Sequence, residues 1–214
     1  MLEFVGSVLG IILIDLVLSG DNAVVIGMAA RGLPPHQRRR AIVYGGGAAV
    51  VLRILFTAIA ALLLQIPLLH FVGGLLLVYI AFKLLRSETG EEGVREGRHL
   101  PDAIRVIVLA DAVMSLDNML AVGAQAHGDL RLLLFGLALS IPLLLVGSSV
   151  VATLMERFPW LVWGGAGILA WTAGQMMVED QLVHPYFGLL PNAAVVFPAL
   201  IVLVVLGVSW MLPS

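Results

Sequence analysis

The sequence contains no cysteine, and only 12% of its 214 residues are charged. The absence of cysteine excludes disulfide bonds and thiolate metal sites. Soluble domains carry about 25% charged residues, whereas this chain is 60% hydrophobic with a mean hydropathy of +1.05. One soluble core cannot bury that much apolar surface, so we expect most of the chain to lie in a lipid bilayer.

Two further absences narrow the function. The phosphate-binding pattern G-x4-G-K-S/T does not occur, which excludes ATP hydrolysis by a P-loop. A net charge of −2 gives no reason to expect nucleic acid as a partner.

Seven apolar runs fill nearly the whole length. Each has the roughly 20 residues that a transmembrane helix needs and is too long for a strand. The sequence therefore predicts an all-α fold, a polytopic membrane helix bundle with seven transmembrane helices. The runs cover residues 3–30, 37–64, 68–86, 103–126, 131–155, 159–178 and 192–212.

Lysine and arginine are distributed unevenly between the two sides of this bundle. Nearly all of them fall in or beside the loops that follow the first, third and fifth helices, while the opposite side has only Arg131. Because cytoplasmic loops carry the excess of positive charge, we predict a multi-pass protein of the cell membrane with its N-terminus outside and its C-terminus in the cytoplasm. Glu179 and Asp180, at the outer end of the sixth helix, are predicted to form a solvated cap.

The chain also contains an internal repeat. Residues 14–32, IDLVLSGDNAVVIGMAARG, and 110–128, ADAVMSLDNMLAVGAQAHG, share the pattern D-x3-S-x-D-N-x4-G at an offset of 96 residues. Weaker matches pair Tyr44-Gly45 with Phe135-Gly136, and Gly73 with Gly165. We predict two three-helix repeats, 1–86 and 102–178, separated by a polar cytoplasmic loop at 87–101 and followed by an outer loop and seventh helix at 179–214.

The odd number of helices in each repeat determines their relative orientation. The first helix enters the membrane from outside and the fourth enters from the cytoplasm, so the two copies are inverted. Inverted repeats are common in secondary transporters, which bind their substrate near the middle of the membrane between the repeats.

The two motifs place oxygen-bearing side chains near the middle of the first and fourth helices. An aspartate at a helix centre costs about 2.5–3.5 kcal/mol on insertion scales. A lone aspartate or asparagine can simply join helices by hydrogen bonds, but two identical clusters favour a binding site. Carboxylate, amide and hydroxyl oxygens suit hard cations such as Mg²⁺, Ca²⁺ and Mn²⁺. The predicted metal ligands are Asp15, Ser19, Asp21, Asn22, Asp111, Ser115, Asp117 and Asn118.

Helical geometry separates one member of the first motif from the others. At about 100° per residue, Asp15, Ser19 and Asn22 share one side of an unbroken helix, and Asp21 points well away from them. Either Asp21 faces another partner, or the helix is locally unwound near Ser19 and Gly20.

Arg53 lies inside the second predicted helix, where a charge is costly. One interpretation is a counter-charge to the carboxylates that shifts during transport. The alternative is a long side chain that reaches to the membrane interface. At about 1.5 Å per residue, Arg53 lies roughly 10 Å or more from the nearer helix end, which favours the counter-charge.

The paired blocks DLVLSGDNAVVIG and DAVMSLDNMLAVG resemble the TerC family of integral membrane proteins, and the short length is most similar to its small YjbE-like branch. The resemblance extends over about residues 3–212. It implies a seven-helix bundle that exports manganese from the cytoplasm, within a wider group that includes lysine exporters. The family's acidic motif residues match Asp15, Asp21, Asn22, Asp111, Asp117 and Asn118 one for one.

On this basis we predict an exporter of a divalent cation, Mn²⁺ before Ca²⁺ or Mg²⁺, that works by proton antiport, is not an enzyme and requires no cofactor. Its predicted partners are the cation and the lipid bilayer, and the sequence fixes no oligomeric state.

Two alternatives stay open. An exporter of a small cationic solute such as an amino acid would also need an anion-binding group. An intramembrane aspartyl protease needs one aspartate from each helix and a water, and has no use for the paired asparagines and duplicated serines.

Overall fold

The fold is known from a computed structural model of the chain. The structure describes residues 6, 8–12, 20–31, 33–59, 63, 66–89, 99–125, 130–187 and 192–211, and the side chains of 87–89, 117–125, 130–133 and 141 are not part of the description. All regular structure within these ranges is helical, as the sequence predicts. The helices are α2 (Gly20–Ala30), α3 (Pro35–Ala58), α5 (Leu69–Thr89), α6 (Leu100–Gln125), α7 (Leu130–Arg157), α8 (Trp160–Glu179), the short α9 (His184–Phe187) and α10 (Ala193–Met211).

Outside the first run, where residues 3–5, 7 and 13–19 lie beyond the described ranges, the helix ends agree with the predicted apolar runs to within about three residues, with one exception. The run at 37–64 predicts a longer helix than the structure contains, because α3 ends at Ala58 and Ile59 leaves the helical conformation with φ −110° and ψ 14°. Pro34 and Pro35 define the start of α3, as expected for proline in a first helical turn.

Five helical segments within the described ranges are long and apolar enough to cross a membrane. They are Pro35–Ala58, Leu69–Arg86, Leu134–Arg157, Trp160–Glu179 and Ala193–Met211. The prediction of a multi-pass membrane protein is thereby supported, while the count of seven spans and the repeat architecture stay predictions. Of the other three described helices, α9 is a single short turn, α2 carries Asp21 and Asn22 of the first motif, and α6 carries the second motif.

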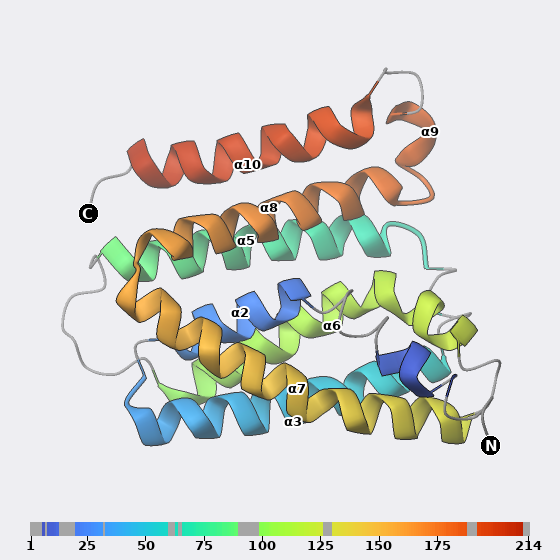
Figure 1. Ribbon diagram of the computed structural model, residues 1–214. Helices are drawn as coiled ribbons and strands as arrows, with labels where there is room; N and C mark the ends of the chain where they lie inside the picture. Colours follow the sequence, from blue (N-terminus) through green and yellow to red (C-terminus); the bar gives the residue numbers. More distant parts are fainter. Residues whose placement is uncertain are drawn as a thin grey trace.

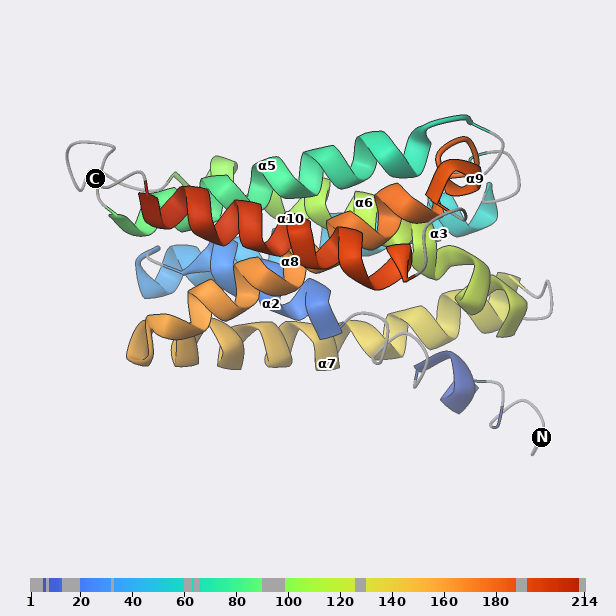
Figure 2. The ribbon, with the colours of Figure 1, turned by 90° about the horizontal axis from the view of Figure 1, so that it is seen from above.

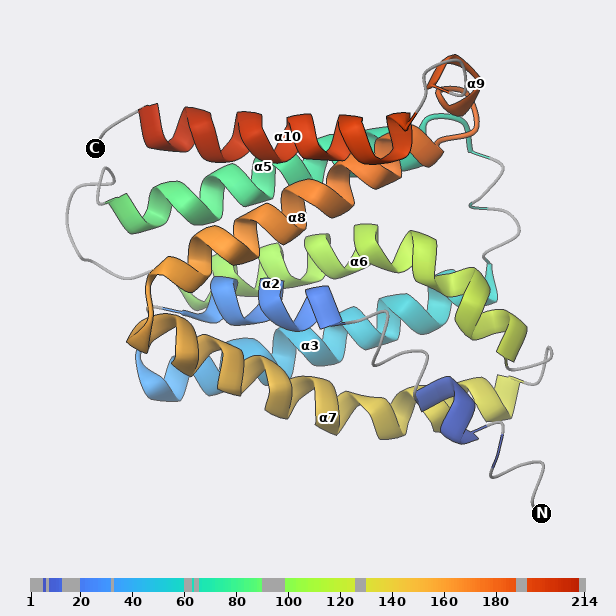
Figure 3. The same ribbon diagram turned by 45° about the horizontal axis from the view of Figure 1, so that its top comes forward.

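The bundle is layered around these two helices. Figures 1 and 3 show α2 and α6 in the middle, with α3 and α7 on one side and α5 and α8 on the other. In the view from above, α10 crosses over α8 and forms the outermost layer (Figure 2). The motif helices are therefore covered by protein on both sides, whereas α10 leaves large apolar side chains such as Leu203 and Val204 exposed, as expected of a helix that faces lipid.

The direction of the chain in Figure 1 alternates from one long helix to the next. As a result, α2 and α6 run antiparallel beside each other in the centre of the bundle. Asp21 and Asn22 of the first motif therefore lie on a helix that runs opposite to the one carrying the second motif.

Glycine permits close helix contacts on the side of the bundle formed by α5, α8 and α10. A Cβ added to Gly74 in α5 would lie 2.6 Å from the backbone oxygen of Ala173 in α8. Similarly, a Cβ on Gly174 in α8 would lie 2.5 Å from Cα of Pro198 in α10. Small residues at such positions let membrane helices approach closely and gain dispersion contacts. The pairs α5–α8 and α8–α10 depend on them.

Asp180 differs from the prediction of a solvated cap. Its side chain is buried, and its two carboxylate oxygens accept backbone hydrogen bonds from Phe71 at 3.2 Å and Leu182 at 3.0 Å. A carboxylate is stabilised at the N-terminal turn of a helix, where backbone N–H groups lack partners, and Phe71 lies in the first turn of α5. Asp180 therefore joins the end of α8 to the start of α5.

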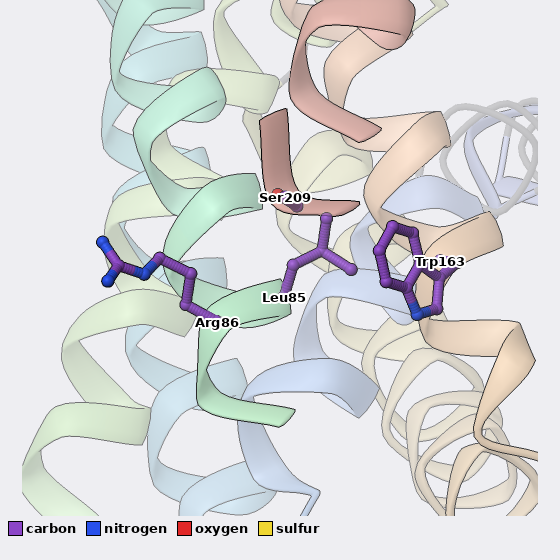
Figure 4. Close-up of a pocket in the computed structure, with 4 residues that line it drawn as sticks. All are labelled: Leu85, Arg86, Trp163 and Ser209. Atoms are coloured by element: carbon purple, nitrogen blue, oxygen red, sulfur yellow. The ribbon is translucent and has the colours of Figure 1, made fainter. Parts of the chain in front are cut away.

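The ends of α5, α8 and α10 also form a small surface pocket. Leu85, Arg86, Trp163 and Ser209 line it, and Figure 4 shows the Arg86 guanidinium directed away from the other three side chains. This pocket lies at helix ends and contains no motif residue.

Gly74→Ala should destabilise the protein, because the added methyl group meets a backbone oxygen that cannot move aside by a rotamer change. Overpacking of this kind costs about 1–3 kcal/mol. Thermal unfolding in detergent measures the effect. Gly164→Ala in α8 is the control, since nothing lies within 4 Å of its Cβ position. Equal midpoints for the two variants would contradict close packing at Gly74.

Candidate functional site

The second motif lies on an uninterrupted helix. Helix α6 runs from Leu100 to Gln125 and includes all four motif positions 111, 115, 117 and 118. No local unwinding occurs in this copy. Asp111 and Ser115 are one turn apart and share a face. Both are buried in the bundle, with exposed fractions of 3% and 0%.

Asp111 is the centre of a hydrogen-bond network. Arg53 donates from Nη2 to Oδ1 of Asp111 at 2.6 Å, and Asn22 donates from Nδ2 to the same oxygen at 3.0 Å. Ser115 donates from Oγ to the other oxygen, Oδ2, at 3.2 Å. Nε of Arg53 in turn donates to Oγ of Ser115 at 3.1 Å. Three helices thus meet at one carboxylate.

Arg53 reaches this network because α3 packs along α6. Its side chain is 2% exposed and pairs with a carboxylate that is equally buried. A side chain that extended to the membrane interface would have an exposed end, so that alternative is wrong. Thr57, one turn further along α3, donates to the backbone oxygen of Arg53 at 2.8 Å.

The first motif contributes through α2, whose described part begins at Gly20. Asn22 is 1% exposed and spans the interface between α2 and α6 through its bond to Asp111. Its other side-chain atom, Oδ1, is buried and has no hydrogen-bond partner in the described part of the chain. Asp21 is half-buried, and its Oδ1 accepts a 2.9 Å bond from the backbone N–H of Asn22.

The remaining predicted ligands are only partly covered by the structure. Asp15 and Ser19 lie outside the described residues, and for Asp117 and Asn118 only the helical backbone is described. Of the eight predicted ligands, the structure brings together Asn22, Asp111 and Ser115, with Asp21 next to Asn22 in the chain. Within the described ranges no three histidine, cysteine or acidic side chains cluster.

The described groups could hold a hard cation only after a rearrangement. Asp111, Ser115 and Oδ1 of Asn22, which has no hydrogen-bond partner among the described residues, supply oxygen ligands of the type that such cations prefer. The Arg53 guanidinium at present balances the negative charge of Asp111. The sequence indicates that Arg53 balances one of the motif carboxylates, but it does not indicate which carboxylate the arginine contacts.

Comparison with known proteins identifies the family of this chain. The sequence matches the Integral membrane protein TerC family over residues 2–214. The chain belongs to the TerC family. It is 40% identical over 207 residues to the uncharacterized membrane protein YjbE of Bacillus subtilis strain 168, covering 97% of this chain and 95% of that protein.

Similarity to a second membrane protein is weaker. The uncharacterized membrane protein YceF of the same organism is 23% identical over 202 residues, covering 88% of this chain and 78% of its own. No solved structure matches the chain. Membership in this family of integral membrane proteins is consistent with membrane transport and confirms the resemblance seen in the motifs.

Asp111→Ala should strongly destabilise the protein, because it leaves the Arg53 guanidinium buried without its carboxylate. Breaking a buried ion pair from one side costs about 3–5 kcal/mol. Asp102→Ala on the same helix is the matched control. Its carboxylate is 54% exposed and lies 3.8 Å from exposed Arg105, so we expect a change within about 0.5 kcal/mol. Unfolding midpoints in detergent compare the two, and a similar loss for both would contradict the importance of the pair.

Proposed function

We propose that this protein exports a divalent cation, Mn²⁺, from the cytoplasm, and that both motifs together form the binding site. The observation that carries the proposal is the bond between Asn22 of the first motif and Asp111 of the second, which are 89 residues apart. At least one residue of each motif therefore lies at the same place in the core, which supports a shared site. The choice of manganese rests on the resemblance to the TerC family, and the oxygen ligands fit it.

We also propose that residues 1–86 and 102–178 form inverted repeats. Equivalent glycines support this arrangement, since a Cβ on Gly45 would lie 3.0 Å from Ile107 and the matching Gly136 packs against Ile11. The isoleucines are 96 residues apart, the same offset as the motifs.

A second pair of contacts joins equivalent helices, although the residues contacted are not themselves equivalent. A Cβ on Gly73 would lie 2.9 Å from Val113 in α6, and one on Gly165 would lie 2.9 Å from Val24 in α2. The helix pairs α3–α6 and α7–α2, and also α5–α6 and α8–α2, correspond under the exchange of repeats. Such correspondence is what a two-fold axis in the membrane plane would produce.

Export of a dication needs an energy source that the chain itself does not contain. Moving two positive charges out against an inside-negative potential costs about 4.6 kcal/mol per 100 mV. A passive pore would let the ion enter. Exchange of protons for the cation at the motif carboxylates would offset this cost, and two protons for one Mn²⁺ would make the exchange electrically neutral.

The topology can be tested with introduced cysteines, because the native chain has none. With the N-terminus outside and seven spans, a cysteine at Leu190 should react with a membrane-impermeant maleimide added to intact cells, and one at Thr89 should react only after permeabilisation. The reverse pattern would refute the orientation. Labelling of both from the same side would refute the seven-span count.

Transport can be tested in proteoliposomes that enclose a pH-sensitive dye. We expect a Mn²⁺ gradient to drive proton movement in the opposite direction, and Asp21→Asn with Asp117→Asn to abolish both fluxes, because the carboxylates bind the cation. Asp102→Asn, the same chemical change at an exposed position of α6, should retain both. Manganese flux without any pH change would exclude proton coupling, and absence of flux in the native protein would exclude manganese as substrate.

A further inference from the structure

The Arg53 guanidinium is bonded to two groups that the proposed function assigns to the cation. Nη2 contacts Oδ1 of Asp111 at 2.6 Å and Nε contacts Oγ of Ser115 at 3.1 Å. A third proposed ligand, Asn22, donates to the same Asp111 oxygen. The positive charge of Arg53 therefore already occupies the environment in which a metal ion would be bound.

Arg53 has no charged counterpart in the second of the two proposed repeats. The matched pair Gly45 and Gly136 is 91 residues apart, and the residue 91 positions after Arg53 is Leu144, which is 5% exposed. The local backbone contacts agree, since Thr57 donates to the oxygen of Arg53 at 2.8 Å and Ser148 donates to the oxygen of Leu144 at 2.7 Å. The second repeat thus has an apolar side chain where the first has a buried cation.

Packing alone does not account for this arginine. Replacing a buried ion pair by apolar residues of similar volume is often neutral or stabilising, and the bundle itself accommodates leucine at the equivalent position. The role of a cation at such a site must therefore lie in its interaction with the carboxylate that it contacts, Asp111.

We propose that Arg53 is a tethered cation that replaces the substrate on Asp111 whenever the transporter carries no metal ion. This inference rests on the proposed function. When the metal ion binds, the guanidinium leaves Asp111; when the metal ion is released, it returns. Asp111 is then compensated in both states, so the metal-free protein can reorient without a buried, unpaired carboxylate, a step that would otherwise be slow.

Two modes of transport distinguish a tethered cation from a residue with any other role. Net Mn²⁺ transport requires the metal-free protein to reorient, whereas exchange of external ⁵⁴Mn²⁺ for internal Mn²⁺ requires only the loaded protein to do so. Arg53→Leu, which copies the second repeat, should lower net transport about tenfold or more while leaving exchange within about twofold of the native rate. Because both modes are measured on the same preparation, their ratio does not depend on how much protein is active.

Two further variants distinguish charge from shape. Arg53→Lys keeps the charge and should retain more net transport than Arg53→Leu. Arg105→Leu, at a position 77% exposed near the start of α6, should leave both modes unchanged. Loss of Arg53 also removes the competitor for Asp111, so Mn²⁺ should raise the thermal midpoint of Arg53→Leu more than that of the native protein.

The double variant Arg53→Leu, Asp111→Asn tests a purely structural pair. It removes both charges together, so stability should recover, and transport should recover with it if neither Arg53 nor Asp111 has a role beyond the pair. A tethered cation predicts that stability recovers and transport does not, because Asp111 is itself a ligand. Equal loss of net transport and exchange in Arg53→Leu, or no loss in either, would overturn the inference. If the native protein shows neither mode with Mn²⁺, the proposed function fails instead.

Discussion

The pair formed by Arg53 and Asp111 is the constraint on which the centre of this molecule depends. Its two side chains are 2% and 3% exposed, and an ion pair in such surroundings is stable only when its hydrogen-bonding groups are also satisfied. Ser115 and Asn22 supply partners, and the contacts of Asp111 with Arg53 and Asn22 fix α3 and α2 against α6. The polar residues therefore determine how the central helices align, while the apolar residues determine that they pack.

Close approach of the helices is the second requirement, because a network with bonds of 2.6–3.2 Å tolerates little displacement. Glycine provides this approach where α3 meets α6, at Gly45, and where α5 meets α6, at Gly73. In a membrane the apolar side chains gain little by leaving lipid, so small residues and interhelical hydrogen bonds have to hold the helices together. The glycines and the motif act together, since the first bring the helix axes close enough for the second to bond.

The elements that the sequence predicted well are those with a one-dimensional signal. The apolar runs located the helices because their length is set by the membrane, and the repeated motif located the buried Asp111 because charge is rare in this chain. Pairing between helices has no such signal: nothing in the sequence indicated that Arg53 contacts Asp111, or that Asn22 of one copy bonds to the other copy. The sequence predicts a solvated Asp180 because this residue lies at a helix end. Its backbone partner Phe71 is 109 residues away, and no sequence pattern indicates that contact.

The contrast between the repeated set of proposed ligands and a single arginine bears on how such a site would work. If the two repeats exchange conformations during transport, the oxygen ligands of one motif take the place of those of the other, and the cation meets the same chemistry from either side of the membrane. Arg53 does not follow this symmetry, because Leu144 stands at the equivalent position. Its contact with Asp111 would then belong to one conformation more than to the other, since the exchange moves α3 relative to α6. A charge on one repeat alone can therefore make two otherwise equivalent conformations differ in energy, which repeated ligands by themselves cannot do.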